Sequence, residues 1–335
     1  MKITKLKTAA ILLITILFFS ACEMKKTGLT HSTGKTSEML VVTNNKTQWN
    51  SKIGKMIKKF FGQEQICLPQ PEPLFTMFNI PEKSLSKIFK SNRNIFIVDI
   101  NEKIEKPQIE SKRDFWAIPQ RVIKITAPND SSFINIFNKN KEAILSLYQE
   151  VERERINKAF ASIKQGKVIA ELDKNLKLTL SIPSGYKVAV KDNNFMWIRK
   201  ETLQESQGII IYCYDYTDTN SFNLENIIAK RNEITKKYIP GPTDDSYMQV
   251  SEDVILPVAK QINFNDKFAI ETRGLWKVEG DFMGGPFLSY TLIDELRDRV
   301  ITIDGYVYAP KDKKRNLLLQ LEAILHTLKI SEIKE

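Results

Sequence analysis

The stretch FMWIRKETLQESQGIIIYCYDY, residues 195–216, contains two apolar runs rich in β-branched and aromatic residues. Such residues are enriched in β-strands, so the stretch predicts two strands in succession. Similar runs occur on both sides of it. They are LKLTLSIP (176–183), YKVAV (186–190), and segments around 267–279, 287–294 and 299–308. The succession predicts an antiparallel sheet.

Two helices accompany these strands. One is expected at about 222–238. The other is the last helix, which carries apolar residues on one face at Leu317, Leu318, Leu321, Ile324, Leu325 and Leu328. Residues 174–330 are therefore predicted to form an antiparallel-sheet α+β domain packed by helices. The order of elements loosely resembles the fold shared by the photosystem protein PsbP and Mog1, a resemblance that implies no function.

The preceding part of the chain predicts a different domain. A chain of 335 residues is long enough for about two domains. Strands are expected at EMLVVT (38–43), NIFIVDI (94–100) and RVIKIT (121–126), and a long helix at about 141–164. The three prolines of LPQPEPLF (68–75) predict an extended loop. Residues 39–165 are thus expected to form a mixed α/β domain, with the boundary near 166–175, and the chain as a whole is placed in the α+β class.

The N-terminus has the pattern of an export signal. Three lysines precede an apolar stretch too short to span a membrane, and small residues follow at Ser20 and Ala21. Cys22 comes next, and the order resembles the lipobox of bacterial lipoproteins, with Phe19 where Leu is usual. We expect residues 1–21 to be removed and Cys22 to carry lipid. The alternative is an ordinary secretory signal with a chance cysteine. Residues 22–38 are polar and are expected to form a flexible tether.

Charge and cysteine content limit the partners. The formal net charge is +10, and it becomes +7 without the three lysines of residues 1–21. Acidic residues are interleaved almost everywhere and there is no long basic stripe, so no nucleic-acid partner is expected. Basic residues beside the anchor suit anionic membrane lipid. Cys67 and Cys213 are free to pair in an oxidising compartment, but they are predicted to lie in different domains and to remain unpaired thiols.

No residue constellation specifies a reaction. The two histidines, His31 and His326, lack the companions that a catalytic triad or zinc site requires, and His326 is expected to lie at a helix end. GLTHSTGKT (28–36) has one residue too many for a phosphate-binding loop and precedes a strand. We therefore expect no catalytic residue, no metal and no cofactor.

The most distinctive stretch is RGLWKVEGDFMGGPF (273–287). Its aromatic and acidic side chains form a candidate binding surface, to which RDFWAIPQ (113–120) adds a second pair. The candidate residues are Arg273, Trp276, Glu279, Asp281, Arg113 and Trp116. The alternative interpretation is a β-hairpin with Trp276 in the core and the polar residues outside.

Several stretches resemble a known family. They are TGKTSEMLVV (33–42), EQICLPQPEPLF (64–75), IFKSNRNIFIVDI (88–100), RDFWAIPQ, KKYIPGPTDDSYM (236–248) and RGLWKVEGDFMGGPF. Together they are similar to the domain-of-unknown-function family numbered 4837, a family of Bacteroidetes lipoproteins. The resemblance extends from about Thr33 to Ile330. It implies a lipid-anchored envelope location and supplies no catalytic residues.

These observations lead to two functional hypotheses. The first is a lipid-anchored cell-envelope protein that binds or scaffolds a protein or glycan partner without catalysis, held in the outer membrane and facing the periplasm. The alternative is an envelope hydrolase that acts on glycan through paired carboxylates. Two carboxylates about 5–10 Å apart in a deep cleft would favour the hydrolase, whereas an exposed apolar or aromatic patch would favour the binding protein.

Overall fold

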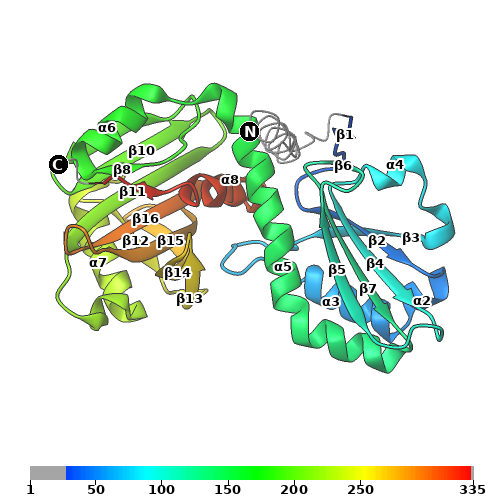
Figure 1. Cartoon of the computed structure of the whole chain (residues 1–335). Helices are drawn as coiled ribbons and strands as arrows, with labels where there is room; N and C mark the ends of the chain where they lie inside the picture. Colours follow the sequence, from blue (N-terminus) through cyan, green and yellow to red (C-terminus); the bar gives the residue numbers. More distant parts are fainter. Residues whose placement is uncertain (1–27, 333–335) are drawn as a thin grey trace, which may run out of the picture.

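The structure is a computed structural model of the chain, and it describes residues 28–332. The predicted signal peptide, Cys22 and residues 22–27 of the predicted tether lie outside the described residues. Two lobes lie side by side (Figure 1). The long helix α5 (Asp130–Phe160) runs along the N-terminal lobe and reaches the C-terminal lobe, where it packs against α8 (Arg315–Leu325).

The N-terminal lobe is built on a five-stranded sheet of order β3-β2-β4-β7-β5. The first four strands are parallel and β5 is antiparallel to β7. The strands are β2 (Glu38–Thr43), β3 (Thr76–Pro81), β4 (Asn94–Ile100), β5 (Gln108–Arg113) and β7 (Arg121–Ala127). Short strands β1 (Thr30–His31) and β6 (Ala117–Ile118) pair at its edge.

Helices cover both faces of this sheet. On one face lie α3 (Lys52–Phe61) and α5, whose apolar sides enclose a core that includes Phe61, Phe96 and Phe137. On the other face lie the short helices η1 (Glu82–Ser84) and α4 (Lys87–Lys90). α2 (Lys46–Asn50) leads into α3, and side chains cap both helices of the first face. A parallel sheet covered on both faces is the arrangement that buries such apolar strands.

The C-terminal lobe is an eight-stranded antiparallel sheet of order β12-β14-β15-β16-β11-β10-β9, with β13 also paired to β14. The predicted α+β class is therefore confirmed. Its strands are β9 (Lys187–Asp192), β10 (Phe195–Glu201), β11 (Ser206–Asp215), β12 (Tyr247–Ser251), β13 (Val258–Phe264), β14 (Lys267–Glu279), β15 (Gly284–Asp294) and β16 (Arg299–Tyr308).

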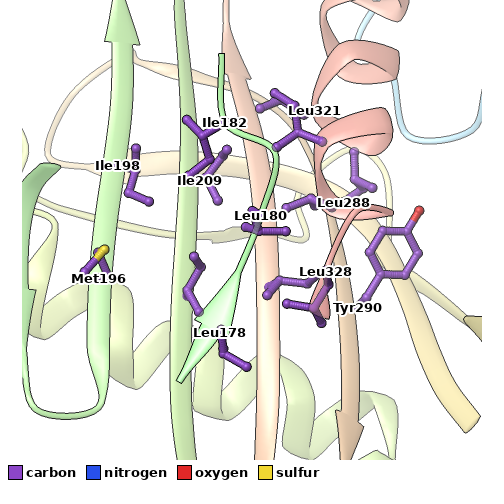
Figure 2. Close-up of a cluster of buried hydrophobic side chains, with 14 of the residues drawn as sticks. Leu178, Leu180, Ile182, Met196, Ile198, Ile209, Leu288, Tyr290, Leu321 and Leu328 are labelled. Carbon is purple, nitrogen blue, oxygen red and sulfur yellow. The ribbon is translucent and has the colours of Figure 1, made fainter. Parts of the chain in front are cut away.

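Each face of this sheet has its own apolar core. One face packs against α6 (Gly166–Leu176) and α8, together with the short strands β8 (Leu178–Thr179) and β17 (Lys329–Ile330). Figure 2 shows the segment with Leu178, Leu180 and Ile182 crossing over the strands, with Leu321 of α8 beside it. The opposite face carries the aromatic residues of β10, β14 and β16 and is covered in part by α7 (Leu224–Tyr238).

An arm of the N-terminal lobe, residues 62–75, fastens the lobes together (Figure 1). Its Leu68 enters the apolar core of the C-terminal lobe. The Glu72 carboxylate accepts hydrogen bonds from the backbone N–H groups of Lys314 (2.6 Å) and Arg315 (3.2 Å) at the start of α8. These N–H groups have no partner within the helix, so Glu72 caps α8 from the other lobe.

Three expectations about boundaries need correction. Residues 28–38 of the predicted flexible tether belong to the fold, because β1 pairs with β6 and the buried Ser37 donates its N–H to Glu152. The long helix begins at Asp130, eleven residues earlier than predicted, because Asn129 caps it by accepting from the N–H of Ser132. Residues 166–175, near which the boundary is expected, belong to α6, which packs on the C-terminal lobe.

Candidate functional site

A network of buried charges lies where the two lobes meet. Arg273 of β14 forms ion pairs with Glu322 of α8 (2.8 Å) and Glu271 (2.9 Å), and Arg153 of α5 binds the other oxygen of Glu322 (2.9 Å). A second part centres on Glu152 of α5. It accepts from Asn94 (2.7 Å), Arg155 (2.5 Å), the Ser37 N–H (3.1 Å) and Arg93 (3.3 Å).

The electrostatics of this network oppose acid catalysis. Burial alone would raise the pKa of Glu322, but Arg273 and Arg153 outweigh it and lower that pKa to about 2. Arg273 likewise outweighs burial at Glu271 and lowers its pKa. A general acid needs a raised pKa to keep its proton at neutral pH. These carboxylates therefore stay ionised and join the lobes.

A groove opens at one end of the antiparallel sheet, on the face that α7 covers incompletely. It encloses about 680 Å³, within the usual range for ligand pockets. Its walls come from three segments, residues 202–206 between β10 and β11, residues 239–242 after α7, and Pro310 beyond β16. Met283 of the turn between β14 and β15 completes the lining.

Four aromatic rings form the floor of the groove. They are Trp197, Trp276, Tyr306 and Tyr308. Both indole N–H groups are used inside the protein, since Trp197 donates to the Tyr306 hydroxyl (3.0 Å) and Trp276 donates to the Val307 carbonyl (3.2 Å). Burial raises the pKa of Tyr306 to about 12, so its hydroxyl stays protonated. Neither indole therefore has a donor left for a ligand, and Trp197, Trp276 and Tyr306 are themselves buried.

Glycines make room for these rings. A Cβ at Gly208 would lie 2.0 Å from the ring of Tyr306, and one at Gly285 would lie 2.0 Å from the Val307 carbonyl oxygen. Both distances are impossible for a side chain, so Tyr306 and β16 approach their neighbours closely only because glycine stands there. The GGP sequence at 284–286 thus shapes the groove.

The rim of the groove is polar but carries one prominent apolar side chain. Arg199 lies over the Trp197 ring, 4.8 Å from its centroid, and forms an ion pair with Glu201. Leu203, at the tip of the β10–β11 turn, is fully exposed. An apolar floor, a polar rim and an exposed apolar tip are the features expected of an interaction site.

In the N-terminal lobe, an open hollow of about 680 Å³ lies beside the carboxyl ends of β4 and β7, lined by Ile100, Glu102 and residues 128–131, but the switch point of the sheet itself is closed. In doubly wound sheets, ligands bind beyond the carboxyl ends of the strands where the strand order reverses, here between β2 and β4. Asn44 closes this point. Its side chain donates to the carbonyl of Ile100 (3.0 Å) and accepts from the N–H of Ile100 (3.3 Å).

The candidate residues of the β14–β15 hairpin separate onto different surfaces. Trp276 is buried in the groove floor, as the hairpin interpretation expected, whereas Arg273 is not outside but buried in the interlobe network. Residues three apart on a strand face opposite sides. Glu279 is exposed and accepts from Gln249, and Asp281 accepts from the Met283 N–H within the turn.

Arg113 and Trp116 lie in the N-terminal lobe and contribute nothing to the groove. Arg113 forms an ion pair with Glu154 of α5. Trp116 packs on the face that α4 covers, with its ring centroid 4.6 Å from that of Phe115. The six candidate residues therefore do not form one site.

The cysteines and the half-buried His326 have structural roles. Cys67 and Cys213 are buried free thiols, which confirms the predicted absence of a disulfide between them. His326 lies at the end of α8 as expected, and its Nε2 is 3.2 Å from the Tyr290 hydroxyl. Burial lowers the pKa of His326 to about 4, so it is neutral at pH 7 and does not interact with the helix dipole as a cation.

Sequence reasoning missed most of the groove. Tyr306, Tyr308 and Trp197 are distant in the sequence from Trp276, and their local pattern predicts only that they lie in strands. A signal was present in the alternation of Trp197 with Arg199 and of Tyr306 with Tyr308, which places each pair on one face of its strand. Their meeting depends on the order of the strands in the sheet.

Residues 28–332 contain neither a membrane-spanning helix nor a cluster of metal-binding side chains. No helix in this range is long and apolar enough to cross a membrane. Within the same range, no three His, Cys, Asp or Glu side chains are grouped as a metal site would require.

The class of the protein follows from these features: a two-lobed α+β protein with a doubly wound lobe, an antiparallel-sheet lobe and an aromatic groove in the latter. Residues 165–327 match the family model described as Domain of unknown function (DUF4837), and this part of the chain belongs to that domain family. Residues 32–161 match a second model, Domain of unknown function (DUF8532). The expected family is thus confirmed for the C-terminal lobe, while the N-terminal lobe matches a model of its own. No protein of curated function matches the sequence significantly.

Solved structures resemble about half of the chain. One is the Ran-binding protein Mog1p of Saccharomyces cerevisiae, with 10% identity, a TM-score of 0.28, and coverage of 46% of this chain and 90% of that one. Another is a mutant of protein Mog1, with 9% identity, a TM-score of 0.30, and coverage of 47% of this chain and 92% of that one. A third is LpqN, described as involved in cell envelope biogenesis of Mycobacterium tuberculosis, with 12% identity, a TM-score of 0.28, and coverage of 46% of this chain and 83% of that one. At these scores the likeness carries no information about function.

Proposed function

We propose that the protein is a non-enzymatic binding module of the cell envelope, anchored by lipid on Cys22, that captures its partner in the groove of the C-terminal lobe. The aromatic groove is the observation that carries the proposal. It combines a cavity of about 680 Å³, a floor of four rings and the exposed Leu203 at its rim. The anchor, and the outer-membrane location facing the periplasm, rest on the order of residues around Phe19 to Cys22.

The rival function, a glycan hydrolase with paired carboxylates, has less support. Glu271 and Glu322 have lowered pKa values and are bound by arginines. Asp304 has a pKa raised by burial, as a general acid would, but both its oxygens are bound by Arg231 (2.8 and 3.3 Å) beneath α7. Asp304 is not among the residues that line the groove. A paired, buried carboxylate cannot reach a glycosidic oxygen.

In-cell photocrosslinking tests the binding function. A benzoylphenylalanine residue in place of Leu203 is expected to give a specific adduct after illumination of living cells. The same residue in place of Val254, which is also highly exposed in the same lobe but is not among the residues that line the groove, is the matched control and should give none. Equal adducts at both positions, or none at either, would contradict the proposal.

Two experiments test the anchor and its side of the membrane. The Cys22→Ser variant should incorporate no labelled palmitate and should retain its signal peptide. Protease added to intact cells should leave the native protein whole. Label on the variant would refute the anchor, and digestion without lysis would place the protein on the cell surface.

A further inference from the structure

The hydrogen bonding of the groove floor restricts the chemistry of the occupant. Both indole N–H groups are consumed internally, so a sugar ring or a peptide carbonyl placed on the floor would find no indole donor. Burying hydroxyl groups without partners is costly. An apolar side chain has no such requirement, and Met283 supplies an adaptable surface for it. The floor is therefore suited to an apolar anchor.

The walls of the groove also favour an apolar occupant. Pro240 and Pro242 on one side and Pro310 on another present rigid apolar surfaces, and all three are exposed beside the groove. Leu203 projects fully into solvent above the floor. Binding interfaces commonly place an apolar anchor in a pocket surrounded by such a rim.

The charges around the groove add a second restriction. The three segments 202–206, 239–246 and 280–283 contain four acids and no base. The acids are Glu205, Asp244, Asp245 and Asp281. Asp244 and Asp245 are exposed. The fourth segment, beyond Pro310, is basic, with exposed Lys311 and Lys313. Among the lining residues Arg199 is paired with Glu201, so Glu205 leaves a net negative charge, and the exposed Asp244 and Asp245 follow the 239–242 wall; on a chain of net charge +10 this local acidity favours a cationic partner.

We infer that the occupant of the groove is an extended protein segment that places a large apolar side chain on the aromatic floor and flanking Lys or Arg residues against the acidic segments. This inference rests on the proposed binding function and names its partner class. Neutral glycans satisfy neither restriction, because they offer no positive charge and need donors that the indoles of the floor lack.

Peptide selection tests the inference directly. The purified protein is used to select from a displayed library of random dodecapeptides, with the Leu203→Asp/Met283→Asp variant as the counter-selection. The selected peptides, made synthetically, are titrated while tryptophan fluorescence is recorded. We expect them to share one large apolar residue with a Lys or Arg nearby, and replacement of that apolar residue by Ala should weaken binding about tenfold or more. Circular dichroism confirms that the variant is folded.

Charge variants provide the matched comparison. Asp244→Asn/Asp245→Asn should weaken binding of the selected peptides about fivefold at low salt, and the loss should shrink as salt rises. Asp245 has φ of 60°, which asparagine tolerates. Asp298→Asn, at the opposite end of the sheet with φ of 49°, should leave affinity unchanged.

Three results would overturn the inference. One is that no peptide is enriched over the counter-selection variant. Another is that the selected peptides lack basic residues or bind equally to the Asp244→Asn/Asp245→Asn variant. The third is that a tetramer of N-acetylglucosamine, the glycan probe, binds in the groove and changes the fluorescence. If any of these occurred while the Leu203 photoprobe still gave its adduct in cells, the binding function would stand and the partner class would be wrong.

Discussion

The interlobe network and the aromatic groove differ in the kind of side chain they are built from. The network consists of buried charged groups that bind one another, whereas the groove consists of aromatic rings with apolar side chains exposed at its rim. In the network, Glu322 holds an arginine on each oxygen, and Glu152 accepts from four donors. In the groove, Trp197 donates to the Tyr306 hydroxyl and Trp276 to the Val307 carbonyl, while Leu203 and the prolines of the walls stay exposed to solvent.

This difference separates stability from binding. Buried charges that are fully paired leave nothing to offer a ligand, and breaking one pair exposes an uncompensated charge. An exposed apolar side chain of the rim such as Leu203 gives little to the folded state, but a partner that covers it gains burial free energy. We therefore expect variants of the network to affect unfolding and variants of the groove to affect binding.

The largest effect is expected from Arg273→Ala. It leaves Glu322 and Glu271 buried with one cation fewer, which typically costs about 3–5 kcal/mol. Urea unfolding measures the loss. Arg113→Ala is the control, because its ion pair with Glu154 is partly exposed and should contribute about 0–1 kcal/mol. Equal effects of the two variants would show that burial does not distinguish these pairs.

A large effect of pH is expected next. His326 has a pKa of about 4 in the folded protein and about 6.5 unfolded, so the unfolded chain binds the proton first as pH falls. Stability present above pH 6.5 is lost between about 6.5 and 4, by about 3 kcal/mol at most. Glu322 adds a second loss between about 4.5 and 2. His326→Gln should flatten the first window and leave the second. An unchanged profile would contradict the assignment.

A moderate effect is expected from the cap that crosses between the lobes. Glu72→Ala removes the acceptor of the first N–H groups of α8 and should cost about 1–2 kcal/mol in urea unfolding. Glu82→Ala, in an exposed part of the N-terminal lobe, serves as the control and should change the free energy of unfolding by less than about 0.5 kcal/mol. The cap assignment fails if Glu72→Ala is as mild as the control.

The smallest effect on stability is expected in the groove. Leu203→Asp removes a fully exposed apolar side chain and should change the free energy of unfolding by less than about 0.5 kcal/mol. It should nevertheless weaken peptide binding strongly. A large loss of stability would mean that Leu203 supports the fold and would remove the contrast between the two regions.

The sequence predicts secondary structure better than it predicts contacts between residues that are far apart in the chain. The apolar runs at 195–201 and 208–216 became β10 and β11, because strand composition is local information. Arg273 was mistaken for an exposed hairpin residue, because its partner Glu322 lies 49 positions later on another element. The proline-rich arm was recognised as a loop, but nothing local indicated that Glu72 would cap α8.

The groove was beyond sequence reasoning for the same reason. Trp197 and Trp276 belong to strands that three others separate in the sheet, yet both line the same cavity. The glycines that permit it, Gly208 and Gly285, are informative only once the position of Tyr306 and β16 is known.

The division between a structural network and a binding groove is tested most directly by crosslinking in two variant backgrounds. A photoreactive residue replaces Pro240, on the wall of the groove, and the adduct yield in cells is compared between Leu203→Asp and Glu72→Ala chains of matched abundance. We predict that the adduct is lost in the Leu203→Asp background and retained in the less stable Glu72→Ala background. Loss in the Glu72→Ala background with retention in Leu203→Asp would contradict the account.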